Sequence, residues 1–91
     1  MIACDSSTLI LLAKVGLLDS LLYKTELVIP KRVYEESTIK KDLLDSKLIE
    51  NRTKNQKIAI REIIQKELYQ KLLKDFNIGK GEAEAITLAI E

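Results

Sequence analysis

The sequence predicts an α/β fold in which helices flank a small, mostly parallel β-sheet. Two short apolar runs, Met1–Cys4 and Leu27–Pro30, are typical of buried parallel strands. A helical pattern follows each run, and strands that alternate with helices favour a parallel sheet. The 91 residues suffice for one small domain, expected to span residues 1–91.

The first predicted strand, Met1–Cys4, leads directly into a helix. Asp5-Ser6-Ser7 is a run of good N-cap residues, and the apolar stretch that follows predicts a largely buried helix over Thr8–Val15. Gly16 suits the C-terminal cap of that helix. Leucines at helical spacing predict a second short helix over Leu17–Tyr23.

The second predicted strand is Leu27–Pro30. Pro30 ends the ladder and suits the opening of a helix over Lys31–Lys41. A turn of helix is expected over Asp42–Leu48, and a third strand, at an edge of the sheet, is expected at Leu48–Asn51.

The remainder predicts two helices. Asn55 is expected to cap a long helix over Gln56–Phe76, in which apolar residues recur every four positions. A break containing Gly79 and Gly81 separates it from an Ala-rich helix over Glu82–Glu91. The chain stops within that helix pattern, so we expect a sheet that is incomplete on the C-terminal side.

Composition excludes several kinds of chemistry. The chain has no histidine, which removes Ser-His-Asp triads and most zinc sites. Cys4 is the single cysteine, so no internal disulfide is expected, and a reducing, cytoplasmic location is predicted. The net charge of +1 does not indicate a nucleic-acid partner by itself.

Three groups of carboxylates are placed where they could act together. Asp5 follows the first strand, Glu35 and Glu36 lie in the helix after the second strand, and Glu82 and Glu84 open the last helix. The carboxyl ends of parallel strands form the functional crevice of an open sheet, and carboxylate oxygens suit Mg²⁺ or Mn²⁺. Each group also has an ordinary structural reading. Asp5 would be a helix cap, the central pair a solvated face, and the last pair a complement to the helix dipole.

Three motifs together resemble the PIN-domain ribonucleases, especially the prokaryotic branch with a Gly-Glu-Ala-Glu-Ala motif. The matching segments, in the order of the family, are Ala3–Ile10, Ile29–Glu36 and Gly81–Ala89. The resemblance implies an α/β/α sandwich and an endoribonuclease that depends on Mg²⁺ or Mn²⁺. It also implies a role as the toxin of a toxin–antitoxin pair, with RNA and an antitoxin protein as partners.

The same resemblance implies the site residues. Asp5, Glu36 and Glu82 match the catalytic, metal-binding acids, and Glu84 is a further metal ligand. The family's fourth acid, on a later strand, has no counterpart, so we expect weak or absent nuclease activity from this chain. The first strand is then expected to lie at an edge of the sheet, where a homodimer would cover it.

A non-catalytic RNA-binding or protein-interaction module is the alternative function. Residues Asn51–Lys80 carry eight Lys or Arg residues and three Asp or Glu residues, a surplus of five positive charges. That surplus could steer RNA. Because the cations are interleaved with acids, it could equally be the solvated face of a helix.

Overall fold

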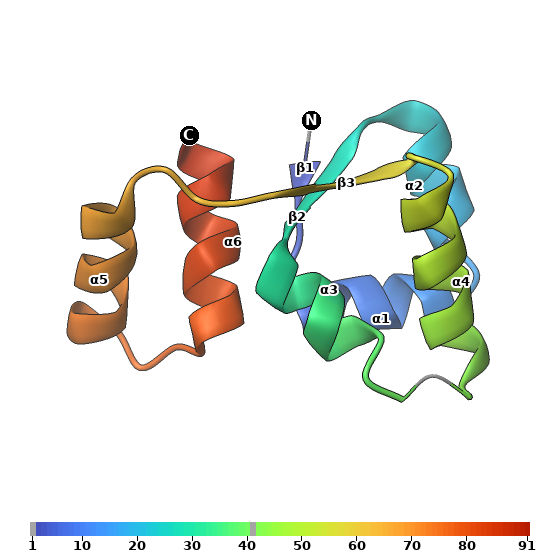
Figure 1. The fold of residues 1–91 in the computed structure, drawn as a ribbon, viewed down its shortest axis with the longest axis horizontal. Coiled ribbons are helices and arrows are strands. Elements are labelled where there is room, and N and C mark those ends of the chain that lie inside the picture. The colour runs from blue at the N-terminus through green and yellow to red at the C-terminus, as the bar shows by residue number, and fades with distance from the viewer. Residues whose placement is uncertain (1, 41) are drawn as a thin grey trace.

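The computed structural model describes residues 2–40 and 42–91, and within them three strands form a single parallel sheet (Figure 1). The strand order is β1-β2-β3, so β2 is central. This confirms the predicted α/β class. The elements in chain order are β1 (Ile2–Ala3), α1 (Ser6–Lys14), α2 (Leu18–Lys24), β2 (Leu27–Pro30), α3 (Lys31–Ser37), α4 (Leu44–Lys54), β3 (Ile58–Arg61), α5 (Lys66–Asp75) and α6 (Lys80–Ile90).

Strand β1 lies at an edge of the sheet, as expected from the sequence. It pairs with β2 in parallel register, with Ile2 opposite Leu27 and Ala3 opposite Val28. The expectation that this strand is buried on both faces is wrong, because the Ile2 side chain is 42% exposed. Met1, with which the predicted strand began, and Lys41, with which the predicted third helix ended, lie outside the described residues.

The third strand is not where the sequence predicted it. Residues 48–51 lie inside α4, and Asn55 is the C-cap of that helix rather than the N-cap of another. The predicted helix over Gln56–Phe76 is also wrong, because its first part is β3 and only α5 is helical. Pairing with β2 accounts for the strand, since Ile58 and Ile60 lie opposite Leu27 and Ile29.

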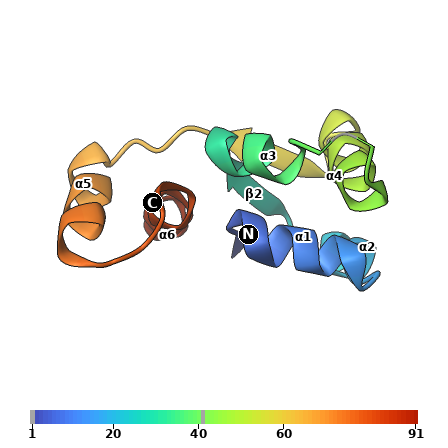
Figure 2. The same cartoon turned by 90° about the horizontal axis from the view of Figure 1, so that it is seen from below.

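The sheet separates two helical layers, which is the predicted α/β/α arrangement. Leu27 and Ile29 face a core that α1, α2, α3 and α4 complete, whereas Val28 faces the opposite side, near Leu88 of α6. Alternate residues of a strand point to opposite faces, so this central strand is buried on both. Figure 2 shows α1–α4 on one side of β2, with α6 on the other side and α5 outermost.

Helix α1 begins as the cap residues predict but buries only one face. Asp5 is the N-cap, Leu9 is fully buried, and Leu11 is 59% exposed. The expectation of a largely buried helix is therefore wrong. Gly16 directly follows the C-cap residue Val15 and has a φ of 77°, a left-handed conformation that glycine adopts without strain.

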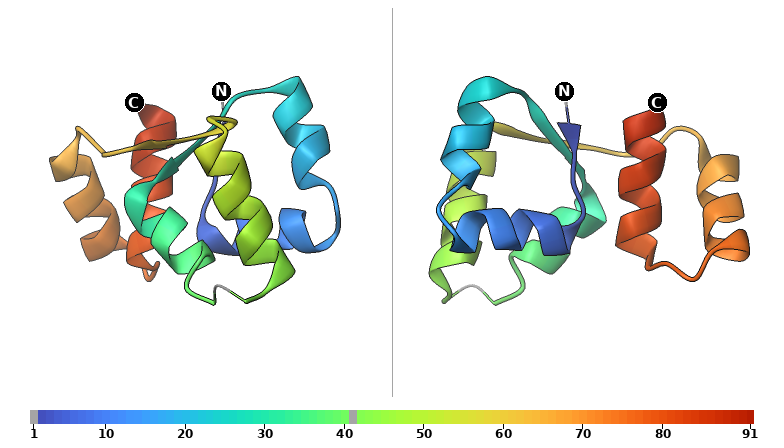
Figure 3. Two further views of the ribbon diagram at one scale, coloured as in Figure 1. Left: turned by 45° about the vertical axis from the view of Figure 1, so that its right-hand side comes forward. Right: turned by 180° about the vertical axis from the view of Figure 1, so that it is seen from behind.

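Helices α5 and α6 pack side by side as the outer layer (Figure 3). Glu91 connects this layer to the segment that follows β3, because its Oε2 accepts hydrogen bonds from the backbone N–H groups of Ile64 (2.6 Å) and Gln65 (2.7 Å).

Within the described ranges, none of the helices taken singly has the length and apolar character needed to span a bilayer. By those two criteria alone, α1 and α2 would qualify together, as a pair bent by 110°.

Candidate metal and phosphodiester site

Asp5 lies at the carboxyl end of β1, two residues beyond the strand. Its Oδ1 accepts a hydrogen bond of 3.0 Å from the backbone N–H of Thr8, which fixes the side chain as the cap of α1. The side chain is only half-buried. The capping interpretation is therefore correct. The capping hydrogen bond engages Oδ1 alone. No hydrogen bond from the described residues engages Oδ2, which is therefore available to a ligand.

Glu82 lies in the first turn of α6 and shares a cavity with Asp5. The cavity has a volume of about 370 Å³, and Cys4, Thr8 and Ala85 also contribute to its wall. Oε1 of Glu82 accepts a long hydrogen bond of 3.4 Å from the backbone N–H of Gly79. The fold thus brings together two carboxylates that are 77 residues apart in the sequence.

Glu36 approaches the same turn of α6 from α3. Its Oε1 lies 2.6 Å from the position that a Cβ atom would occupy on Gly81, so any side chain on this residue would displace the carboxylate from its present position. Gly81 is buried and directly precedes Glu82. Glu36 and the neighbouring Glu35 are both exposed, and each lines a cavity other than the one that Asp5 and Glu82 share.

Glu84 has a different environment from the other three acids. Its Oε1 accepts a hydrogen bond of 2.9 Å from Nε of Arg32, and its side chain is only 15% exposed. This hydrogen bond is the main reason that the pKa of Arg32 is raised, and the nearby Glu84 and Glu36 carboxylates add to it. Arg32 is therefore paired with one of the predicted acids, Glu84.

Sequence reasoning did not identify Arg32 or Gly81 as site residues. Both lie within the matching motifs, and Arg32 is one helical turn before Glu36. Their positions inside the motifs were the only sequence feature that pointed to them. The contacts that they make between α3 and α6 depend on tertiary packing.

The acids have the right chemistry for a hard divalent cation, because all of their donor atoms are carboxylate oxygens. Asp5 and Glu82 face one cavity, and Glu36 lies against the residue beside Glu82. In the present conformation, however, no three Asp, Glu, Cys or His side chains in ranges 2–40 and 42–91 are arranged to hold one ion. Rotation of these side chains, two of them exposed, would be needed to complete a three-ligand set.

Cys4 lines the same cavity but is unsuited to act as a nucleophile. Burial raises the pKa of its thiol, and the neighbouring Asp5 charge raises it further. The side chain is 6% exposed. Its thiol is therefore protonated at neutral pH and packs as a small apolar group.

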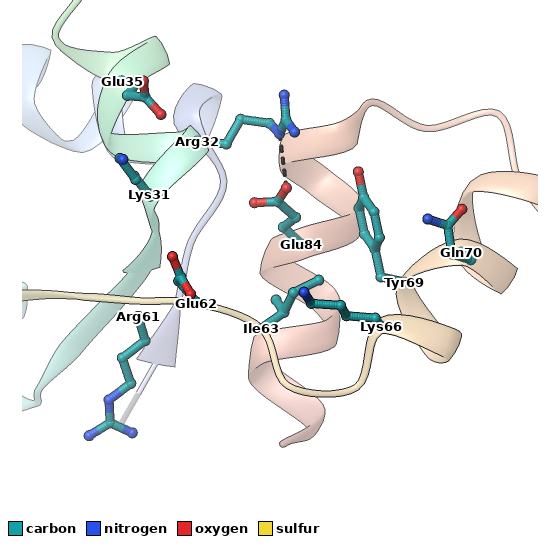
Figure 4. A pocket seen from close by; sticks show the side chains of 10 residues that line it. All are labelled: Lys31, Arg32, Glu35, Arg61, Glu62, Ile63, Lys66, Tyr69, Gln70 and Glu84. Atoms are coloured by element: carbon teal, nitrogen blue, oxygen red, sulfur yellow. Dashed lines mark hydrogen bonds and ion pairs between the residues drawn. The ribbon is translucent and has the colours of Figure 1, made fainter.

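A second and larger cavity lies at the carboxyl ends of β2 and β3. It has a volume of about 460 Å³ and is mostly polar, with basic, acidic and aromatic side chains in its wall (Figure 4). The residues that line it are Lys31, Arg32, Glu35, Arg61, Glu62, Ile63, Lys66, Tyr69, Gln70 and Glu84. The Arg32–Glu84 pair thus belongs to this cavity, while Glu82 belongs to the Asp5 cavity.

Comparison with known proteins identifies the family. The family model DUF3368, described as a PIN domain, matches residues 1–91. No curated protein and no solved structure gave a significant match. Since the family model covers every residue of this sequence, the chain belongs to the PIN-domain family.

Proposed function

We propose that this chain is an endoribonuclease that depends on Mg²⁺ or Mn²⁺ and whose site is formed by Asp5, Glu36 and Glu82. Membership of the PIN-domain family supports a nuclease-type function. The observation that carries the proposal is the cavity that Asp5 and Glu82 share, with Glu36 against the adjacent Gly81.

Each acid has a defined role in this proposal. A bound divalent ion would lower the pKa of a coordinated water and stabilise charge on a phosphodiester. Asp5 would hold the ion through Oδ2, because its Oδ1 already accepts a hydrogen bond from the backbone N–H of Thr8. Glu36 and Glu82 would supply further oxygens beside the first turn of α6, where the helix dipole favours negative charge.

Glu84 is proposed as an additional metal ligand whose availability depends on its ion pair with Arg32. While the ion pair with Arg32 is intact, its Oε1 is engaged. Three oxygen donors from three side chains hold a divalent ion loosely, so we expect low turnover from this chain.

The test is cleavage of RNA by the purified chain in Mn²⁺. Slow cleavage that Asp5→Asn and Glu82→Gln abolish is the expected result. Glu26→Gln is the matched control, because Glu26 is exposed and precedes the amino end of β2, whereas the site lies at the carboxyl ends of the strands. Cleavage that persists unchanged in Asp5→Asn would contradict the proposal.

The second candidate function is RNA binding without cleavage. It is favoured by the absence, within the described residues, of a three-ligand group arranged for one metal ion. Titration with Mn²⁺ separates the two functions. If the ion neither binds nor raises the midpoint of thermal unfolding, while RNA still binds, the non-catalytic function is the correct one.

The cellular role proposed from the family is that of a toxin paired with an antitoxin protein. Induced expression should then arrest growth, and Asp5→Asn should relieve the arrest.

A homodimer is proposed as well. Only one edge of β1 is paired in the described part of the chain, and Ile2 and Ile86 beside it are 42% and 41% exposed. Sedimentation that shows a monomer at every concentration would exclude that dimer.

A further inference from the structure

The larger cavity contains cations that the proposed metal site does not use. Lys31 follows β2 directly, Arg61 ends β3, and Lys66 begins α5. In the described part of the chain none of these three has an ion pair, whereas Arg32 is paired with Glu84. Two of the three, Arg61 and Lys66, belong to the positive surplus of Asn51–Lys80.

The same cavity contains carboxylates that limit the positive field. Glu35 and Glu62 line it and likewise form no ion pair with any described residue. Three unpaired cations therefore face two unpaired acids. A ligand that relied on a broad positive surface, such as duplex RNA contacted through many phosphates, would gain little here. A ligand that combines a few phosphates with another kind of contact would gain more.

Helix α5 supplies that other contact. Tyr69 and Gln70 are adjacent on the helix and both line the cavity. Figure 4 shows the Tyr69 ring between α5 and α6, with its hydroxyl toward Arg32. An aromatic face stacks on a nucleobase of any sequence, and an amide beside it can hydrogen-bond to the edge of the base.

The position of the cavity relates it to the acids. Glu84 lines this cavity, and Glu82, two residues earlier on α6, lines the Asp5 cavity. Arg32 of α3 relates this cavity to the acids, because it donates a hydrogen bond to Glu84 and the Glu36 carboxylate helps to raise its pKa. A strand seated in the larger cavity would therefore reach the acids over the first turns of α6.

We infer that the larger cavity binds a nucleotide of single-stranded RNA next to the bond presented to Asp5 and Glu82. The base stacks on Tyr69, and Lys31 and Lys66 contact the flanking phosphates. An acidic peptide fits less well, since it would leave the Tyr69 ring unused and place carboxylates near Glu35 and Glu62. The inference takes its substrate class from the proposed function, but its test does not require a metal.

The experiment measures the affinity of the full chain for a short fluorescent oligouridine by anisotropy, with a chelator present. Tyr69→Leu should weaken binding about tenfold, whereas Tyr69→Phe should bind as the unaltered chain does. Lys31→Gln and Lys66→Gln should each weaken binding and lower the salt slope by about one. The controls are Tyr23→Leu and Lys24→Gln on α2, where Tyr23 is 92% exposed and remote from this cavity, and neither should change the affinity.

Three results would overturn the inference. One is unchanged affinity in Tyr69→Leu together with Lys66→Gln. Another is equal affinity for a duplex of the same length, which stacking on Tyr69 forbids. The third is displacement of the RNA by oligoglutamate at lower concentration than by unlabelled oligouridine, which would indicate a protein partner. If circular dichroism shows that Tyr69→Leu is unfolded, the variants of the exposed Lys31 and Lys66 decide the outcome.

The outcome is distinguishable from that of the proposed function. Asp5→Asn should bind oligouridine normally in chelator, because Asp5 does not line this cavity. If the chain binds oligouridine normally but shows no metal-dependent cleavage, this inference is supported and the proposed nuclease function is wrong. If Tyr69→Leu and the lysine variants change neither binding nor metal-dependent cleavage, the proposed nuclease function is supported and this inference is wrong.

Discussion

Glu36 and Gly81 meet where α3 approaches the first turn of α6. Oε1 of Glu36 lies 2.6 Å from the point at which a Cβ atom on residue 81 would stand. The missing side chain of Gly81 therefore makes the space that the carboxylate occupies. This contact places Glu36 against the residue that directly precedes Glu82, the acid that shares a cavity with Asp5.

Gly81→Ala should change metal binding more than stability. The added methyl would displace the end of the flexible Glu36 side chain, and alanine is the better helix former by up to about 1 kcal/mol. We expect calorimetry to show Mn²⁺ affinity lowered about tenfold, with the free energy of unfolding lowered by less than about 1 kcal/mol. Unchanged Mn²⁺ affinity would show that the position of Glu36 is unimportant for the ion.

Gly16→Ala is the matched control for that substitution. A Cβ atom at Gly16 would meet no other atom within 4 Å, but the residue has a φ of 77°. Alanine is strained in this left-handed conformation, so the free energy of unfolding should fall by about 1 kcal/mol. Mn²⁺ affinity should be unaffected, the opposite of the result expected for Gly81→Ala.

Two substitutions of Asp5 should separate its capping role from its proposed metal role. Asparagine caps a helix about as well as aspartate but carries no charge, so Asp5→Asn should keep the stability and lose Mn²⁺ binding. Asp5→Ala should also lose the bond to Thr8 and cost about 1 kcal/mol in urea unfolding. Equal destabilisation by both variants would mean that the charge of Asp5, rather than its cap geometry, stabilises α1.

The contact between Asp19 of α2 and Arg52 of α4 predicts a dependence on pH. Nε and Nη2 of Arg52 donate to Oδ1 and Oδ2 of Asp19 at 2.6 and 2.9 Å. The hydrogen bond from Arg52 lowers the pKa of Asp19 in the folded state. The pair therefore stabilises the fold above the ordinary pKa of 3.8, and this contribution is lost as the pH falls through the lowered value.

Arg52→Gln removes this contribution. Its destabilisation, measured by urea unfolding, should be larger at pH 7 than near pH 2. Lys47→Gln is the control, since Lys47 is an exposed residue of α4, and its effect should be the same at both values. If the destabilisation by Arg52→Gln does not shrink in acid, its cause is lost packing of the arginine stem rather than lost charge.

Glu91 should stabilise the segment between β3 and α5. Its Oε2 accepts from the N–H groups of Ile64 and Gln65, and hydrogen bonds to a charged acceptor are stronger than neutral ones. Glu91→Ala should cost about 1 kcal/mol and speed amide exchange at these two residues. Glu67→Gln, on the exposed side of α5, should leave both amides protected. Exchange rates unaltered by Glu91→Ala would show that α5 is anchored by α6 alone.

Much of the fold was predictable where the determining contacts are local. The bounds of β2 were predicted exactly, because Pro30 ends the strand and opens α3. The cap at Asp5 was predictable too, since it involves residues only three apart. The two helices after β1 also follow from nearby leucine spacing and Gly16.

Prediction failed where an element depends on a distant partner. Ile60 and Ile64 fit the four-residue spacing of the helix predicted over Gln56–Phe76, yet the chain is extended from Ile58 to Arg61. Strand formation there depends on pairing with β2, about 30 residues earlier, which no local pattern reveals. Residues 48–51, predicted as a strand, are helical because Ile49 is buried as part of α4 in the core.

The candidate site divides in the same way. By itself, the sequence determined which acids follow the strands, and it determined the cap at Asp5, because motif order and capping are properties of neighbouring residues. Only the tertiary structure decided which acids share a space. It placed Asp5 and Glu82 in one cavity, brought Glu36 against Gly81 and engaged Glu84 with Arg32. These contacts depend on how α6 packs against β1 and α3, which involves residues 45 or more positions apart.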